Sequence, residues 1–126
     1  MSTETTVDVV LRVLGEFDLE TLLQENRGFE PDAIWRQGEV PGRPRLCGFN
    51  KLLSGDIAPQ EAGRELLLTL STYRHMLQQL PSGSAQIDIG VFTCDSPSGV
   101  VLEGRTIEAL AGLGLGLSFT YYPSFD

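Results

Sequence analysis

Three segments of this 126-residue chain alternate apolar and polar residues, and this pattern constrains the fold more than any other feature. Alternation with a period of two is typical of β-strands that bury one face. It favours an antiparallel sheet with helices on a single face, because strands covered on both faces are continuously apolar. We also expect shorter strands over residues 33–39 and 100–103. The apolar positions are Val7, Val9, Leu11 and Val13, then Ile87, Ile89 and Val91, and finally Leu115, Leu117, Phe119 and Tyr121.

Helical signals lie between these strands. Asp18 can cap the backbone amides of Glu20 or Thr21, which predicts a short helix that ends at residues 26–28. A long helix is expected from Pro59 to about Leu80, because proline is tolerated in a first turn and residues 81–84 break the helix. Its buried stripe has spacings of three and four residues and consists of Ala62, Leu66, Leu70, Tyr73, Leu77 and Leu80.

A third helix is expected over residues 106–112, with Ile107, Leu110 and Ala111 facing inward and glycines ending it. Together the elements predict one α+β domain over residues 1–126. We expect a mainly antiparallel sheet of four to five strands with two or three helices packed on one face, in a ferredoxin-like or related arrangement. The length and an apolar content of 41% suit one core that needs no disulfide or structural metal.

The charge of the chain limits its partners. The formal net charge is −8, yet residues 34–51 carry four basic residues and only one acid, Glu39. An acidic protein repels nucleic acids and anionic membranes, and it favours a cationic ligand or a basic protein. The first residues lack a signal-peptide pattern, and no apolar run approaches the roughly 20 residues that cross a bilayer. We therefore expect a cytoplasmic protein with no nucleic-acid or membrane partner.

Residues suited to catalysis or metal binding are few. The only histidine, His75, lies off the apolar stripe of the long helix, which favours a solvated position over a metal ligand. Cys47 and Cys94 do not form a Cys-x-x-Cys pair, and we expect both to be reduced. The glycines of residues 112–116 follow a helix instead of opening one, so they indicate a helix end and not a phosphate loop. We expect no catalytic residues, no metal and no cofactor.

Three segments resemble a known family. The segment Phe17-Asp18-Leu19, the block FEPDAIWRQGE over residues 29–39, and the segment LAGLGL over residues 110–115 before a strand with Tyr121 are similar to the bacterial domain-of-unknown-function family number forty-two seventy-nine. The resemblance covers nearly the whole chain and implies a small α+β protein. Some members of that family resemble or neighbour immunity proteins that neutralise bacterial toxins, so the resemblance implies a binder. The family often continues into a tryptophan-containing strand, whereas this chain has LCGF over residues 46–49.

These observations predict a non-catalytic protein-binding domain, an immunity protein that neutralises a bacterial toxin by occluding its active site. The expected partner is a basic toxin domain, because opposite charges speed association. The strand expected over residues 100–103 also offers an edge through which two copies could form a homodimer. We expect the partner to bind an acidic surface made of Asp56, Glu61, Glu65, Asp95 and Glu103.

The alternative function is a small-molecule-binding or regulatory module with a pocket near Trp35, between helix and sheet, lined by Trp35, Arg36 and Arg45. As the only tryptophan, Trp35 can serve as a core anchor because of its large apolar surface. It can also contact a ligand or partner together with Arg36 and Arg45, whose planar guanidinium groups suit carboxylates or phosphates. A hydrolase or transferase is the third alternative, disfavoured because no pair of nucleophile and base is recognisable.

Overall fold

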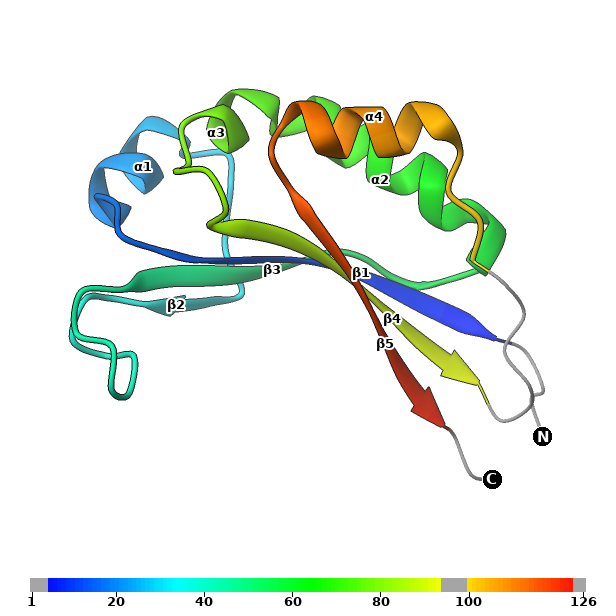
Figure 1. Ribbon diagram of the computed structural model, residues 1–126, viewed down its shortest axis with the longest axis horizontal. Coiled ribbons are helices and arrows are strands. Elements are labelled where there is room, and N and C mark those ends of the chain that lie inside the picture. The colour runs from blue at the N-terminus through cyan, green and yellow to red at the C-terminus, as the bar shows by residue number, and fades with distance from the viewer. Residues whose placement is uncertain (1–4, 94–99, 124–126) are drawn as a thin grey trace.

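The computed structural model describes residues 5–93 and 100–123 and shows a five-stranded sheet with all helices on one face (Figure 1). The α+β class with helices on a single face is confirmed. The elements in chain order are β1 (Thr6–Gly15), α1 (Leu19–Glu25), β2 (Ala33–Trp35), β3 (Cys47–Ile57), a 3-10 turn η1 (Pro59–Glu61), α2 (Ala62–Thr72), α3 (Arg74–Gln78), β4 (Ala85–Thr93), α4 (Gly104–Gly112) and β5 (Gly116–Pro123).

The strand order is β2-β3-β1-β4-β5. The first four strands pair antiparallel, and their connectivity and order are those of the ferredoxin-like split βαβ arrangement. The fifth strand pairs parallel to β4 after a crossover through α4, so the sheet is mixed. The prediction of a mainly antiparallel sheet is confirmed, and the parallel pair of β4 and β5 is the part that one-sided alternation does not indicate. β5 alternates because it lies at the edge of the sheet, where its side chains stay partly exposed although the pairing is parallel.

The core lies between the sheet and the helices. The alternating residues of β1 that were predicted to be buried are all 2% exposed or less, and Ile87 and Ile89 of β4 are fully buried. The predicted stripe of the long helix faces them, with Leu66, Leu70 and Leu77 buried and Tyr73 and Leu80 partly buried against the core. Burying each large apolar side chain contributes roughly 1.5–3 kcal/mol. This core fixes which face of the sheet stays open.

The long helix expected over residues 59–80 is broken into three pieces. η1 leads into α2, and α2 stops at Tyr73, which has φ −104° and ψ 15° and separates it from α3. Two threonine hydroxyls in α2 donate to carbonyls four residues earlier, Thr69 to Glu65 at 2.9 Å and Thr72 to Leu68 at 2.9 Å. Such bonds compete with the helical pattern and bend helices. The break lets the Tyr73 ring pack edge-on against Phe29, with centroids 5.1 Å apart.

The third helix begins two residues earlier than expected and buries a different face. Thr106 and Leu110 are buried, whereas Ile107 is 45% exposed and Ala111 is exposed, so the predicted inward positions are correct only for Leu110. The predicted glycine end is confirmed. The Leu115 amide donates to Leu110 O at 2.9 Å and the Gly114 amide to Ala111 O at 3.0 Å, the pair of bonds of a Schellman motif, with Gly114 at φ +68°.

Two strand predictions differ from the structure. Residues 100–103 form no strand and lead into α4, so a homodimer through that segment has no strand to use. The expected strand 33–39 is shortened to β2, because Gly38 has φ +91° and the Glu39 amide donates back to Arg36 O at 2.9 Å in a turn. The sequence pattern also missed β3, the longest of the strands over residues 5–93 and 100–123. Its pairing with β1 shifts register twice near Val9, which blurs the alternation.

Candidate functional site

Four of the five predicted partner-binding carboxylates gather at one end of the molecule. β1 is antiparallel to both β3 and β4, so the start of β1 and the ends of β3 and β4 meet there. α2 and α4 follow β3 and β4 and begin at the same end, on the right in Figure 1. The fifth residue, Asp95, lies outside the described residues. We call the described carboxylates at this place the acidic end: Asp8, Asp56, Glu61, Glu65 and Glu103.

Packing of α2 against the segment before α4 brings the starts of these two helices together at the acidic end. A side chain at Gly63 in the first turn of α2 would lie 3.7 Å from Val101 O and 3.8 Å from Thr106 Oγ1. Glu61 and Glu65 lie two positions on either side of Gly63, so they share the start of α2 but point to another side of it than this contact. The first turn of a helix favours negative charge, because its free amides carry partial positive charge.

Asp8 belongs to the acidic end although sequence reasoning did not select it. Its Oδ1 accepts a hydrogen bond of 2.8 Å from the amide of Asp56, which has φ +55°. The register with Val7 opposite Ile57 brings these two residues together, and the pattern of one strand does not reveal such a pairing.

Two arginines share this region without neutralising it. Arg105 Nε pairs with Glu103 at 2.9 Å, and both side chains are about two-thirds exposed or more, so the pair contributes little to stability. Arg64 is exposed on α2. Among residues 5–93 and 100–123, no three His, Cys, Asp or Glu side chains are close enough to hold a metal ion. At the acidic end, Asp56, Glu61 and Glu103 are exposed, whereas Asp8 and Glu65 are partly buried.

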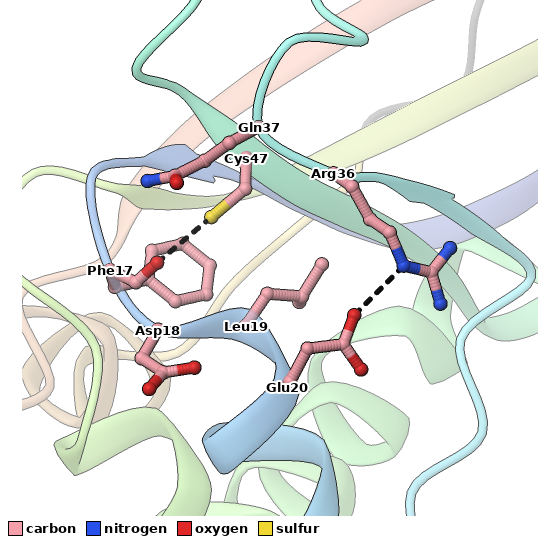
Figure 2. Close-up of a pocket in the computed structure, with 7 residues that line it drawn as sticks. All are labelled: Phe17, Asp18, Leu19, Glu20, Arg36, Gln37 and Cys47. Atoms are coloured by element: carbon pink, nitrogen blue, oxygen red, sulfur yellow. Dashed lines mark hydrogen bonds and ion pairs between the residues drawn. The ribbon is translucent and has the colours of Figure 1, made fainter.

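A first pocket, of about 650 Å³, opens between α1 and the start of the β2–β3 loop (Figure 2). We call it the α1 pocket; its lining residues are Phe17, Asp18, Leu19, Glu20, Arg36, Gln37 and Cys47. Arg36 Nε pairs with Glu20 Oε1 at 2.8 Å, and the free, buried Cys47 thiol lies 3.2 Å from Phe17 O. The polar groups of this pocket therefore already have partners within the chain.

Asp18 occupies the N-cap position that the sequence predicted. Its carboxylate accepts from Thr21 Oγ1 at 2.7 Å and from the Thr21 amide at 3.1 Å. Both bonds favour the ionised form, so the Thr21 hydroxyl first and the Thr21 amide second lower the pKa of Asp18 below its ordinary value. A carboxylate at the start of α1 in turn satisfies backbone donors that the helix leaves free.

A second pocket, of about 550 Å³, lies on the face of the sheet opposite the helices. The β2–β3 loop extends to this side of the sheet and supplies one wall, and the turn before β4 supplies another (Figure 1). Trp35 is half-buried here and lies outside the main core. We call it the open-face pocket; it is lined by Arg12, Val13, Leu14, Trp35, Val40, Pro41, Asn50, Gly83, Ser84, Ala85 and Gln86.

A polar network underlies the open face. Asp88 is 5% exposed, and its Oδ1 accepts from Ser118 Oγ at 3.0 Å and from Thr120 Oγ1 at 2.9 Å. Its Oδ2 accepts from Arg12 Nε at 3.4 Å and from Arg12 Nη2 at 3.3 Å. The network ties β1, β4 and β5 together. Sequence reasoning missed it, although the polar positions of the alternating strands were its signal.

The structure does not bring Trp35, Arg36 and Arg45 into one pocket. Neighbouring residues of a strand point to opposite faces, so Trp35 lines the open-face pocket and Arg36 lines the α1 pocket. Arg45 lines neither of these two pockets, and its carbonyl accepts from Gln37 Nε2 at 3.3 Å. His75 is exposed on α3, in keeping with the solvated position expected from the sequence.

These features define a ferredoxin-like α+β domain with an added helix and strand, an acidic end and two surface pockets. Comparison of the chain with protein-family models, curated proteins and solved structures gave no match. The family resemblance drawn from residues 17–39 and 110–121 stays a prediction. Within the described part of the chain, none of the helices has the length and apolar character that crossing a bilayer requires.

Proposed function

We propose that this chain is a non-catalytic protein-binding domain, an immunity protein that neutralises a basic toxin domain through its acidic end. The observation that carries the proposal is the convergence of Asp56, Glu61, Glu65 and Glu103 on one end of the molecule. These residues are separated by up to 47 positions in the sequence. Carboxylates held on one surface produce a local negative field that a net charge alone does not.

The mechanism is occlusion without turnover. The field of the acidic end would attract a basic partner and orient it, which raises the association rate. The side chain of Val101 just before α4, which is 72% exposed, would then be buried and slow dissociation. A partner whose substrate groove is positively charged would be blocked by such contacts.

The proposal can be tested with two matched variants. The acidic-end variant carries Asp56→Asn, Glu61→Gln, Glu65→Gln and Glu103→Gln. The control variant carries Glu16→Gln, Glu25→Gln, Glu30→Gln and Glu108→Gln, which removes the same charge from exposed positions elsewhere. Asparagine is suitable at position 56 because it tolerates the positive φ found there.

Tagged wild-type protein would be recovered from its native host, and the partners identified by mass spectrometry. We expect a basic protein whose toxic activity is inhibited at a one-to-one ratio by the wild type and the control variant, and poorly by the acidic-end variant. Equal inhibition by all three proteins, or conversion of a substrate by the isolated chain, would contradict the proposal.

The open-face pocket supports a second candidate function, a small-molecule-binding or regulatory module. Its volume of about 550 Å³ lies within the usual range of about 300–1,000 Å³ for ligand pockets, and it combines Trp35 with a few polar groups. The pocket lies across the sheet from the helices, so ligand binding there and partner binding at the acidic end do not require each other.

A further inference from the structure

The open-face pocket has one charged side chain among its lining residues, the guanidinium of Arg12. Its apolar walls include the half-buried indole of Trp35 and the exposed side chains of Leu14 and Pro41. In the sheet register, Arg12 lies directly between Asn50 on β3 and Gln86 on β4. A positive group flanked by two amides thus lies beside an aromatic wall.

The network beneath the pocket holds the Arg12 guanidinium in place. Arg12 Nε and Nη2 both donate hydrogen bonds to Asp88 Oδ2. With the Asn50 amide oriented so that both of its polar atoms are bonded, its oxygen accepts from Arg12 Nη1 at 3.2 Å and its nitrogen donates to Phe49 O at 3.1 Å. These contacts use three of the five N–H donors that a guanidinium carries. One hydrogen on Nη1 and one on Nη2 remain for a ligand, and the Arg12 side chain is 41% exposed.

The charge balance of the site favours a single negative charge on the ligand. The pocket offers one cation, and Asp88 lies behind that cation with its own negative charge. A dianion such as a phosphate monoester would face this carboxylate with only one positive group to balance it. The two oxygens of a carboxylate suit the two remaining donors of Arg12, and its single charge is repelled less by Asp88 than two charges would be.

We propose that the open-face pocket binds a small organic carboxylate with a flat apolar body, the carboxylate on Arg12 and the body against Trp35. Walls from the β2–β3 loop and the turn before β4 limit the space to the size of a small molecule. The inference rests on the second candidate function and names the class of its ligand.

The test uses phenylacetate and its neutral isostere phenylacetamide as probes. Trp35 is the only tryptophan, so a ¹H–¹⁵N correlation spectrum contains a single indole N–H signal. This signal reports on the pocket directly. Phenylacetate should shift this signal saturably, and phenylacetamide should bind about tenfold or more weakly, because it lacks the charge that strengthens the bonds to Arg12.

Three variants locate the site. Gln86→Glu places a carboxylate in the pocket at an exposed position, where the fold tolerates it, and should weaken phenylacetate binding about tenfold by repulsion. Arg12→Lys keeps the charge and loses the paired donors, and it should weaken binding several-fold. Arg45→Gln removes a positive charge outside the pocket and should leave binding unchanged.

The outcomes test the class of ligand and the presence of a ligand-binding pocket separately. If phenylacetamide binds as tightly as phenylacetate, or if Gln86→Glu has no effect, the carboxylate class is wrong while a ligand-binding pocket stands. If neither probe moves the Trp35 signal at millimolar concentration, both the ligand class and the second candidate function are contradicted. Neither result bears on the acidic end.

Discussion

Asp88 connects more of the molecule than any other polar residue described above. Its buried carboxylate accepts from Arg12 on β1 and from Ser118 and Thr120 on β5. Burying a charge is costly unless hydrogen bonds and an opposite charge replace the water it loses. Here they do so, and the same contacts fix the edge strand β5 and the guanidinium of Arg12.

We predict that Asp88→Asn lowers the free energy of unfolding by roughly 1.5–3 kcal/mol, the range of a hydrogen bond to a charged group. The amide keeps the shape of the side chain but loses the charge that pairs with Arg12. Ser118→Ala, which removes one neutral donor, should cost roughly 0.5–1.5 kcal/mol. Urea denaturation measures both. An Asp88→Asn protein as stable as the wild type would show that the network contributes nothing.

A second residue-scale prediction concerns acid stability. The pKa of Asp18 in the folded protein is lower than the ordinary 3.8, because Thr21 donates to the ionised carboxylate. A lowered folded-state pKa means that the stabilisation is present above the ordinary value and is lost as the pH falls through the folded-state value. Asp18→Asn still caps the helix but does not titrate there. Its stability relative to the wild type should be constant from about pH 5 to 7 and rise below about pH 4.

The Thr21→Val variant is the control for this effect. It removes the hydroxyl that is the largest cause of the lowered pKa of Asp18. The free energy of unfolding of Thr21→Val should therefore fall less between about pH 5 and acid pH than that of the wild type. Chemical denaturation at several pH values measures all three proteins. An unchanged difference between wild type and Asp18→Asn at acid pH would contradict the assignment.

Among the elements, β3 determines how the two faces of the sheet are divided, and its glycine at position 48 is packed against β1. Gly48 lies between Leu14 of β1 and Trp35 of β2 in the register. A side chain at Gly48 would collide with the backbone carbonyl of Val13. Backbone atoms cannot move aside as the end of a flexible side chain can.

We therefore predict that Gly48→Ala lowers the free energy of unfolding by about 3 kcal/mol, at the upper end of the cost of overpacking. Gly28→Ala is the matched control, because a Cβ there would have no neighbour within 4 Å, and its effect should stay within about 0.5 kcal/mol. Thermal and urea denaturation of the two variants provide the comparison. Equal stability of both variants would mean that β3 does not lie as close to β1 as described.

The same elements show what local sequence patterns can predict. Alternation predicts β1 and β4 because the residues of these strands that face the helices are apolar and buried. It does not predict β3, because two register shifts opposite Val7–Val10 break the period of that strand. The end of α2 at Tyr73 depends on packing against Phe29, which lies 44 positions earlier in the chain. Contacts between distant segments determine these features, so the periodicity of a short stretch of sequence does not predict them.

At the scale of the whole molecule, the candidate sites also depend on contacts between distant segments. The sequence predicted an acidic surface and named four of its described members, and the antiparallel topology explains why they meet at one end. A pocket was expected near Trp35 between helix and sheet, whereas the open-face pocket lies on the other face of the sheet, and Arg12 and Gln86 were not part of that expectation. They join Trp35 through pairing across β1, β3 and β4, which the sequence of one strand does not specify.

The salt dependence of association tests the central claim most directly. The association rate constant of the captured basic partner should be measured between about 20 and 500 mM salt for the wild type, the acidic-end variant and the control variant, since screening weakens attraction between exposed charges over this range. We predict a steep fall with salt for the wild type and the control variant, and a slower, nearly salt-independent rate for the acidic-end variant. Identical salt dependence in all three proteins would contradict the claim that the acidic end is the docking surface.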